Sequence, residues 1–167
     1  ATSILFLSSI IQFFLVNYAL SIWSFFFGLI FASAILICKD VKQWSATTVI
    51  CLILGVITSF LIGFLTPAEA IQALPYLFLC GMLMIIAMIL PGISGSFILV
   101  LLGAYETALS TIDLVRSFEI QGFINLAAFG LGALVGIKLF SRWVEKLFAS
   151  ARDKLVATMS GFMFGSL

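Results

Sequence analysis

Long apolar runs separated by short polar segments dominate this chain. A helix that crosses a bilayer needs about 20 predominantly apolar residues, because each residue adds ~1.5 Å and the hydrocarbon layer is ~30 Å thick. We predict transmembrane helices over residues 3–18, 21–38, 46–65, 122–140 and 155–167. The pattern therefore predicts an all-α, polytopic membrane protein with one transmembrane domain over residues 1–167.

One apolar run contains a break that an ordinary helix cannot accommodate. No charged residue occurs between Ala70 and Tyr105, yet Pro91-Gly-Ile-Ser-Gly-Ser96 lies in the middle of this stretch. Proline removes an amide donor, and glycine is a poor helix former. The flanking arms, 75–90 and 97–112, measure roughly 24 Å each and are short for a full span. We predict a re-entrant hairpin over residues 75–112, with two short tilted crossings as the alternative.

The distribution of charge predicts how this hairpin is oriented. One set of loops holds the basic residues Lys39, Lys42, Arg142, Lys146, Arg152 and Lys154. The other set holds Glu69, Asp113 and Glu119, with Arg116 as its basic residue. Basic loops stay on the cytoplasmic side of a membrane. We therefore expect the hairpin to open to the exterior and its tip to point inward.

The amino-acid composition excludes several classes of function. Only 9% of residues are charged and the net charge is +1, so there is no basic surface for nucleic acid. The chain has no histidine, which removes the commonest general base and metal ligand. Cys38, Cys51 and Cys80 lie within apolar segments and are expected to be packing residues. We predict no catalytic residue, no metal site and no cofactor.

The break itself predicts an anion site. Irregular backbone at membrane depth is tolerated where it lines a polar cavity, and transporters bind their cargo at such places. A new helix beginning near Ser96 would offer unpaired amides, hydroxyl groups and glycines that let a ligand approach. The predicted binding residues are Pro91, Gly92, Ser94, Gly95, Ser96 and Phe97. The alternative is a Pro-Gly kink whose serines cap their own backbone.

Two charged residues near apolar segments have open interpretations. Glu106 either lies on a proton or substrate path or is an interfacial residue beside the aromatic Tyr105. Lys138 either balances the charge of Glu106 or the cargo, or extends to the cytoplasmic interface. The spacings Gly132-xxx-Gly136 and Gly161-xxx-Gly165 predict close helix packing.

Two motifs resemble a known family. Pro91-Gly-Ile-Ser-Gly-Ser96, followed by Leu101-Leu-Gly-Ala-Tyr-Glu106, closely resembles the signature of the PopT polyprenyl-phosphate transporters. An aromatic segment of that family is matched by Phe26-Phe-Gly-Leu-Ile30. The resemblance mainly concerns the family's second half. It implies two inverted halves, each with its own hairpin, so we expect the amino-terminal half to be absent from this sequence.

The resemblance also implies a function. The expected activity is the flipping of undecaprenyl phosphate across the bacterial cytoplasmic membrane, so that this carrier lipid is recycled. Pro91, Gly92, Ser94, Gly95 and Ser96 would hold the phosphate, and Glu106 would serve coupling or charge balance. The coupling ion (H⁺ or Na⁺) and a homo-oligomer stay open.

Two other functions compete with this interpretation. A transporter of a small soluble anion could use the same tip. A membrane-embedded phosphatase or transferase is disfavoured, because the chain has neither histidine nor clustered carboxylates. We therefore predict that the protein is not an enzyme.

Overall fold

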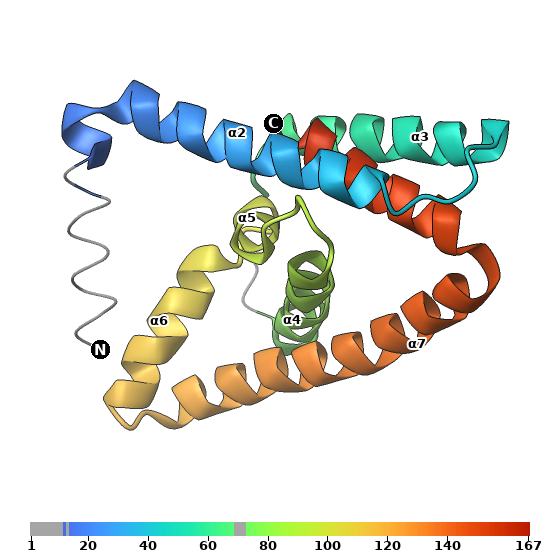
Figure 1. The fold of residues 1–167 in the computed structure, drawn as a ribbon. Helices are drawn as coiled ribbons and strands as arrows, with labels where there is room; N and C mark the ends of the chain where they lie inside the picture. Colours follow the sequence, from blue (N-terminus) through green and yellow to red (C-terminus); the bar gives the residue numbers. More distant parts are fainter. Residues whose placement is uncertain (1–11, 13, 69–72) are drawn as a thin grey trace.

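The computed structural model describes residues 12, 14–68 and 73–167, which form helices joined by turns. The helices are α2 (Ala19–Cys38), α3 (Ala46–Gly63), α4 (Leu74–Ile89), α5 (Gly95–Leu101), α6 (Tyr105–Arg116) and α7 (Ile120–Gly165). Figure 1 shows α7 running beneath the other helices and then turning back towards α3. The all-α prediction is confirmed. The predicted helix 3–18 and the loop residue Glu69 lie largely or wholly outside the described residues.

Helices α2, α3 and α7 are each long and apolar enough to cross a membrane. The pair α5 and α6 could supply a fourth span only if its two bent parts were counted together. Many large apolar side chains face outward, among them Trp23, Leu54 and Leu134. In a membrane protein such side chains contact lipid or neighbouring helices. The prediction of a multi-pass membrane protein is confirmed.

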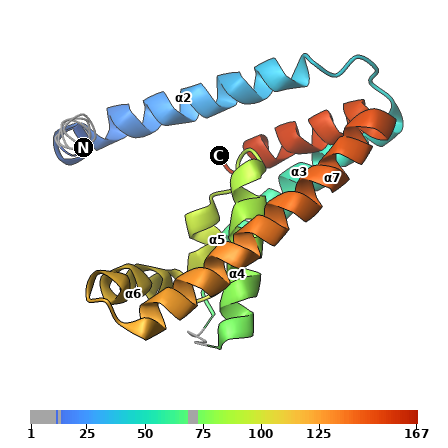
Figure 2. The same ribbon diagram turned by 90° about the horizontal axis from the view of Figure 1, so that it is seen from below.

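Helix α7 organises the fold, because it packs against α2, α3, α4 and α6. It consists of two helices that meet at Ala151, where the backbone leaves helical geometry (φ −147°, ψ 44°). The first part is roughly 45 Å long at ~1.5 Å per residue, longer than the hydrocarbon layer. The polar segment 141–154, expected to separate two spans, is therefore helical on both sides of this kink. Figure 2 shows the second part folded back beside α3.

Close backbone approach explains the glycines of both predicted packing motifs. Gly132 and Gly136 lie directly against the backbone of α4, at Phe78 and Met82. In the second part of α7, Gly161 and Gly165 contact the backbone of α3. A Cβ at any of these glycines would overlap the facing helix. The prediction of helix packing at both spacings is confirmed.

Contacts between α4 and α5 establish the chain reversal. Gly95 packs on Met84 and Met88 near the end of α4. Further along, Leu99 packs with Cys80, and the Tyr76 hydroxyl donates a hydrogen bond of 2.6 Å to the carbonyl of Leu102. Successive residues of α5 thus meet earlier residues of α4, so the two helices are antiparallel.

The second arm of the hairpin differs from the prediction of one helix over 97–112. Helix α5 ends after seven residues, and α6 departs from it at 106°. The cause is a Schellman motif: the amide of Ala104 bonds to Leu99 O at 2.9 Å, and that of Gly103 bonds to Val100 O at 3.0 Å. Gly103 supplies the required positive φ of 64°. The re-entrant arm is therefore short, and α6 lies outside it.

Helix α6 is amphipathic rather than apolar. Thr107 and Thr111 are buried, whereas Asp113 and Arg116 form an exposed ion pair at 3.8 Å. This amphipathic helix begins at Tyr105, within the segment predicted as the second hairpin arm. Such a helix suits the membrane interface better than the hydrocarbon layer.

The tip of the hairpin lies beside the last turn of the second part of α7. Gly92 sits against Phe162 and Met163. From Arg152, at the polar kink, to Phe162 the helix rises roughly 15 Å, which is about half of a bilayer's hydrocarbon thickness. Helix α4 also runs in the same direction as the first part of α7, since Phe78 faces Gly132 and Met82 faces Gly136. The tip therefore points towards the basic end of the molecule.

Candidate functional site

A tight turn forms the tip of the hairpin, which we call the break (residues 90–94). Pro91 and Gly92 occupy its central positions, and the Ile93 amide lies 3.5 Å from Leu90 O. Gly92 has a φ of +88°, the conformation that the third residue of a type II turn requires. A side chain there would also approach Phe162 O to 2.7 Å. Conformation and packing together require glycine at this position.

The backbone after the turn carries unpaired donors. The first amide beyond it to bond within the protein is that of Ile98, which donates to Ser94 O at 3.1 Å. Among the described residues, the amides of Ser94, Gly95, Ser96 and Phe97 have no hydrogen-bond partner. Unpaired backbone donors at membrane depth are costly unless a polar group meets them.

A cavity of about 360 Å³ lies beside these donors, and we call it the tip cavity. Gly92, Ser94 and Phe97 line it from the break and α5, Ser59 lines it from α3, and Ser166 lines it from the end of α7. Ser166 donates to Met163 O at 2.9 Å. The cavity thus brings together hydroxyl groups from three segments that are far apart in the sequence.

Ser59 is the residue that sequence reasoning missed. It is only 7% exposed, and its hydroxyl has no hydrogen-bond partner in the part of the chain that the structure describes. No fully buried side-chain N or O atom of the described residues lacks a partner, so the Ser59 oxygen keeps access to the tip cavity that Ser59 lines. A ligand or water in that cavity can therefore form a hydrogen bond with it. A serine inside the apolar run 46–65 was the available signal, but sequence alone gave no reason to place it beside the break.

The predicted binding residues separate into two groups. Gly92, Ser94 and Phe97 line the tip cavity, whereas Gly95 is buried against Met84 and Met88. The remaining two, Pro91 and Ser96, are not among the lining residues. The hydroxyls of Ser94 and Ser96 lie 2.8 Å apart, so Ser96 can orient Ser94. The alternative, in which both serines cap their own backbone, is not what the structure shows, since Ser94 makes no side-chain capping bond.

An apolar cavity adjoins the tip cavity. It has a volume of about 400 Å³ and is lined by side chains of α3, α4 and α5. Ile62 and Ile93 line both cavities, so the two are neighbours. The tip cavity holds three serines among apolar side chains such as Phe60 and Phe64, whereas the lining of its neighbour is almost wholly apolar. Together they offer hydrogen-bond donors to an anionic headgroup and apolar walls to a lipid tail.

The two candidate charge-balancing residues lie elsewhere. Glu106 is in the first turn of α6, beyond the bend, and lines a separate small cavity with Pro67 and Gly103. Lys138 is exposed on α7. No Lys or Arg side chain of the described residues lines the tip cavity. The structure therefore does not bring either residue to the break, and their roles stay predictions.

Comparison with known proteins gives the family. A family model described as undecaprenyl phosphate translocase-like matches residues 1–167. The chain belongs to this family. It is 36% identical over 166 residues to a polyprenyl-phosphate transporter of Vibrio cholerae, covering 99% of this chain and 52% of that relative. A polyprenyl-phosphate transporter of Staphylococcus aureus is 34% identical over 90 residues, which cover 54% of this chain and 32% of that relative.

These matches confirm the resemblance to the polyprenyl-phosphate transporters. The family and its relatives carry the names of transporters and not of enzymes, as predicted. The chain spans about half the length of the Vibrio cholerae relative. No solved structure matches the chain.

Proposed function

We propose that this chain supplies the phosphate-binding hairpin of a protein that flips polyprenyl phosphate across the bacterial cytoplasmic membrane. The observation that carries this proposal is that Ser94 and Phe97, which have unpaired amides, line one cavity together with Ser59, whose hydroxyl has no partner among the described residues. Polyprenyl phosphate is the cargo named for both relatives. Undecaprenyl phosphate is the cargo that the family description indicates.

The tip would lower the cost of moving a phosphate through hydrocarbon. An isolated anion in an apolar medium is extremely costly. Backbone amides and hydroxyls offset this cost by donating hydrogen bonds to the phosphate oxygens. Helix α5 has only seven residues, so its macrodipole adds little. The local donors of the break, together with Ser59 and Ser94, therefore form the cradle.

The apolar cavity would hold the first isoprene units of the tail. Because Ile62 and Ile93 line both cavities, the tail of a lipid whose headgroup lies in the tip cavity would have only a short path to the apolar one. This arrangement favours a lipid over a small soluble anion. Titration of the purified protein with undecaprenyl phosphate should give much tighter binding than inorganic phosphate. Equal affinity for the two would favour the soluble-anion transporter.

The orientation of the hairpin in the membrane would determine from which leaflet the headgroup is taken. The basic loops at Lys39, Lys42 and the kink favour a cytoplasmic location for that end of the molecule, because basic loops tend to stay on the cytoplasmic side. The hairpin then opens to the exterior and receives the headgroup from the outer leaflet. A second, inverted hairpin would return it to the cytoplasmic leaflet, with H⁺ or Na⁺ as the coupling ion and Glu106 as the candidate coupling residue.

Ser59→Ala tests the cradle directly. Because the hydroxyl has no partner within the described protein, its removal should leave the free energy of unfolding unchanged. Loss of one hydrogen bond to a charged phosphate should weaken lipid binding about ten- to a hundredfold. Binding is measured by titration with undecaprenyl phosphate, and folding by thermal unfolding in detergent.

Thr58→Val is the matched control for this substitution. It also removes a hydroxyl from α3, but Thr58 bonds to Leu54 O at 2.7 Å and does not line the tip cavity. We expect its lipid affinity to equal that of the wild type. Equal affinity of the Ser59→Ala variant and the wild type would contradict a role for Ser59 in the cradle.

A further inference from the structure

A more polar cavity lies at the opposite end of α3 from the tip cavity. Its volume is about 410 Å³, and it is lined by Lys42, Gln43, Ser45, Thr48 and residues 148–154. We call it the kink cavity, because Ala151 interrupts α7 at its wall. Helix α2 ends at Cys38 and α3 begins at Ala46, so the cavity lies where these helices leave the membrane.

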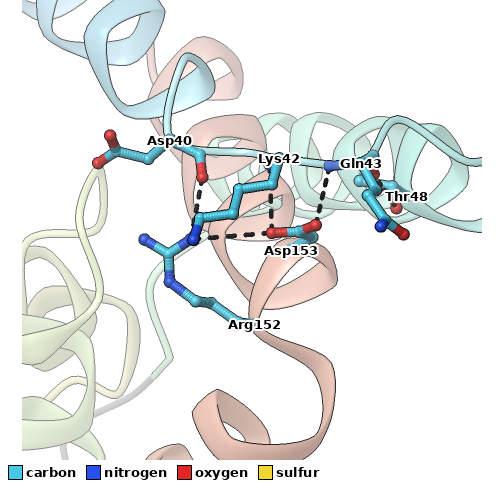
Figure 3. Close-up of polar contacts among 6 residues, drawn as sticks. All are labelled: Asp40, Lys42, Gln43, Thr48, Arg152 and Asp153. Atoms are coloured by element: carbon cyan, nitrogen blue, oxygen red, sulfur yellow. Dashed lines mark hydrogen bonds and ion pairs between the residues drawn. The ribbon is translucent and has the colours of Figure 1, made fainter.

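Hydrogen bonds to the Asp153 carboxylate hold the walls of this cavity together. Asp153 accepts hydrogen bonds from the backbone amides of Lys42 at 3.3 Å and Gln43 at 2.9 Å. Arg152 donates to Asp40 O at 3.1 Å. Figure 3 shows these contacts joining the loop to the beginning of the second part of α7. Asp153 thus fixes the loop, and its negative charge is balanced by the adjacent Arg152 guanidinium at 3.9 Å.

Cationic and hydroxyl side chains dominate the lining. Lys42, Arg152 and Lys154 face one acidic residue, Asp153, so the lining carries two net positive charges (three cations less one carboxylate). Ser45 and Thr48 add hydroxyls. Within the described residues, the side chains of Lys42 and Lys154 have no ion-pair or hydrogen-bond partner. Two ammonium groups at a fixed polar cavity suit a phosphate group, because each can donate to its oxygens.

We propose that the kink cavity binds the phosphate headgroup of an anionic phospholipid in the cytoplasmic leaflet. The basic residues of this end place it at the cytoplasmic surface, where anionic lipids gather and attract basic segments. A lipid is the expected source of the phosphate, because the last turn of α2 and the first turn of α3, on either side of the loop 39–45, carry exposed apolar side chains, including Leu36 and Val49. This proposal goes beyond transport and does not depend on the tip cavity.

Lys42→Gln combined with Lys154→Gln tests the proposal. Both side chains line the cavity without holding the fold, so thermal unfolding in detergent should be unchanged. In a titration with phosphatidylglycerol that is monitored by native mass spectrometry, the double variant should bind this lipid about tenfold more weakly than the wild type. The wild-type protein should prefer phosphatidylglycerol to zwitterionic phosphatidylcholine.

Lys39→Gln combined with Lys146→Gln is the matched control. It makes the same change of charge in the same loop and the same helix, but neither residue lines the cavity. Its affinity for phosphatidylglycerol should stay within about twofold of the wild type. Equal losses in the two double variants would show diffuse attraction and overturn the proposal, as would no loss in either. Inorganic phosphate that binds the wild type as tightly as the lipid would overturn the lipid assignment.

Discussion

Ser94→Leu is expected to abolish translocation of undecaprenyl phosphate while the protein stays folded. The side chain of Ser94 is exposed to the tip cavity, so a leucine there removes a hydroxyl and fills the space of the phosphate. Loss of a hydrogen bond to a charged group, together with exclusion of the headgroup, should reduce transport at least about a hundredfold. The measurement is translocation in reconstituted vesicles.

Ser33→Leu is the control for this substitution. Ser33 lies on α2, away from the tip cavity, and its hydroxyl bonds within its own helix to Leu29 O at 2.8 Å. We expect its transport rate to match the wild type. Undiminished translocation by Ser94→Leu, with the variant shown to be inserted, would remove the break from the transport mechanism.

Gly132→Leu should have the largest effect on folding. Its position on α7 lies directly against the backbone of α4 at Phe78, and a leucine must push the two helices apart. Overpacking at a contact between two backbones should lower the free energy of unfolding by about 3 kcal/mol. The hairpin should then lose its support, and the variant should unfold at a lower temperature in detergent.

Gly130→Leu separates this packing effect from the general effect of replacing a glycine. It lies two residues away on the same helix, and a Cβ there meets no atom within 4 Å. Its unfolding free energy should change by no more than about 1 kcal/mol, with helix propensity favouring leucine. Similar destabilisation of both variants would argue against the close contact between α4 and α7.

The sequence was sufficient to predict most of the fold. Apolar runs predicted α2 and α3 to within a few residues, because lipid demands an uninterrupted apolar helix. Pro91 and Gly92 predicted the chain reversal, because neither can continue a helix at that position. The charged loops predicted that the tip points towards the basic end, which agrees with the direction of α4.

The remaining features depend on contacts between distant segments. Gly103 was quoted as part of a family motif, but its role as the Schellman glycine that ends α5 depends on carbonyls of the preceding turn. Ser59 lies more than thirty residues before Ser94 and joins the site only because α3 packs beside the second part of α7. Glu106 was placed on the hairpin arm by residue counting, which fails once the 106° bend intervenes.

A structure of the protein with bound undecaprenyl phosphate in a lipid nanodisc tests the central claim most directly. We predict phosphate density within hydrogen-bonding distance of the amides of residues 94–97 and of the Ser59 hydroxyl, with the isoprenoid tail leaving past Ile93. Phosphate density elsewhere, with the tip cavity filled by water or side chains, would contradict the account.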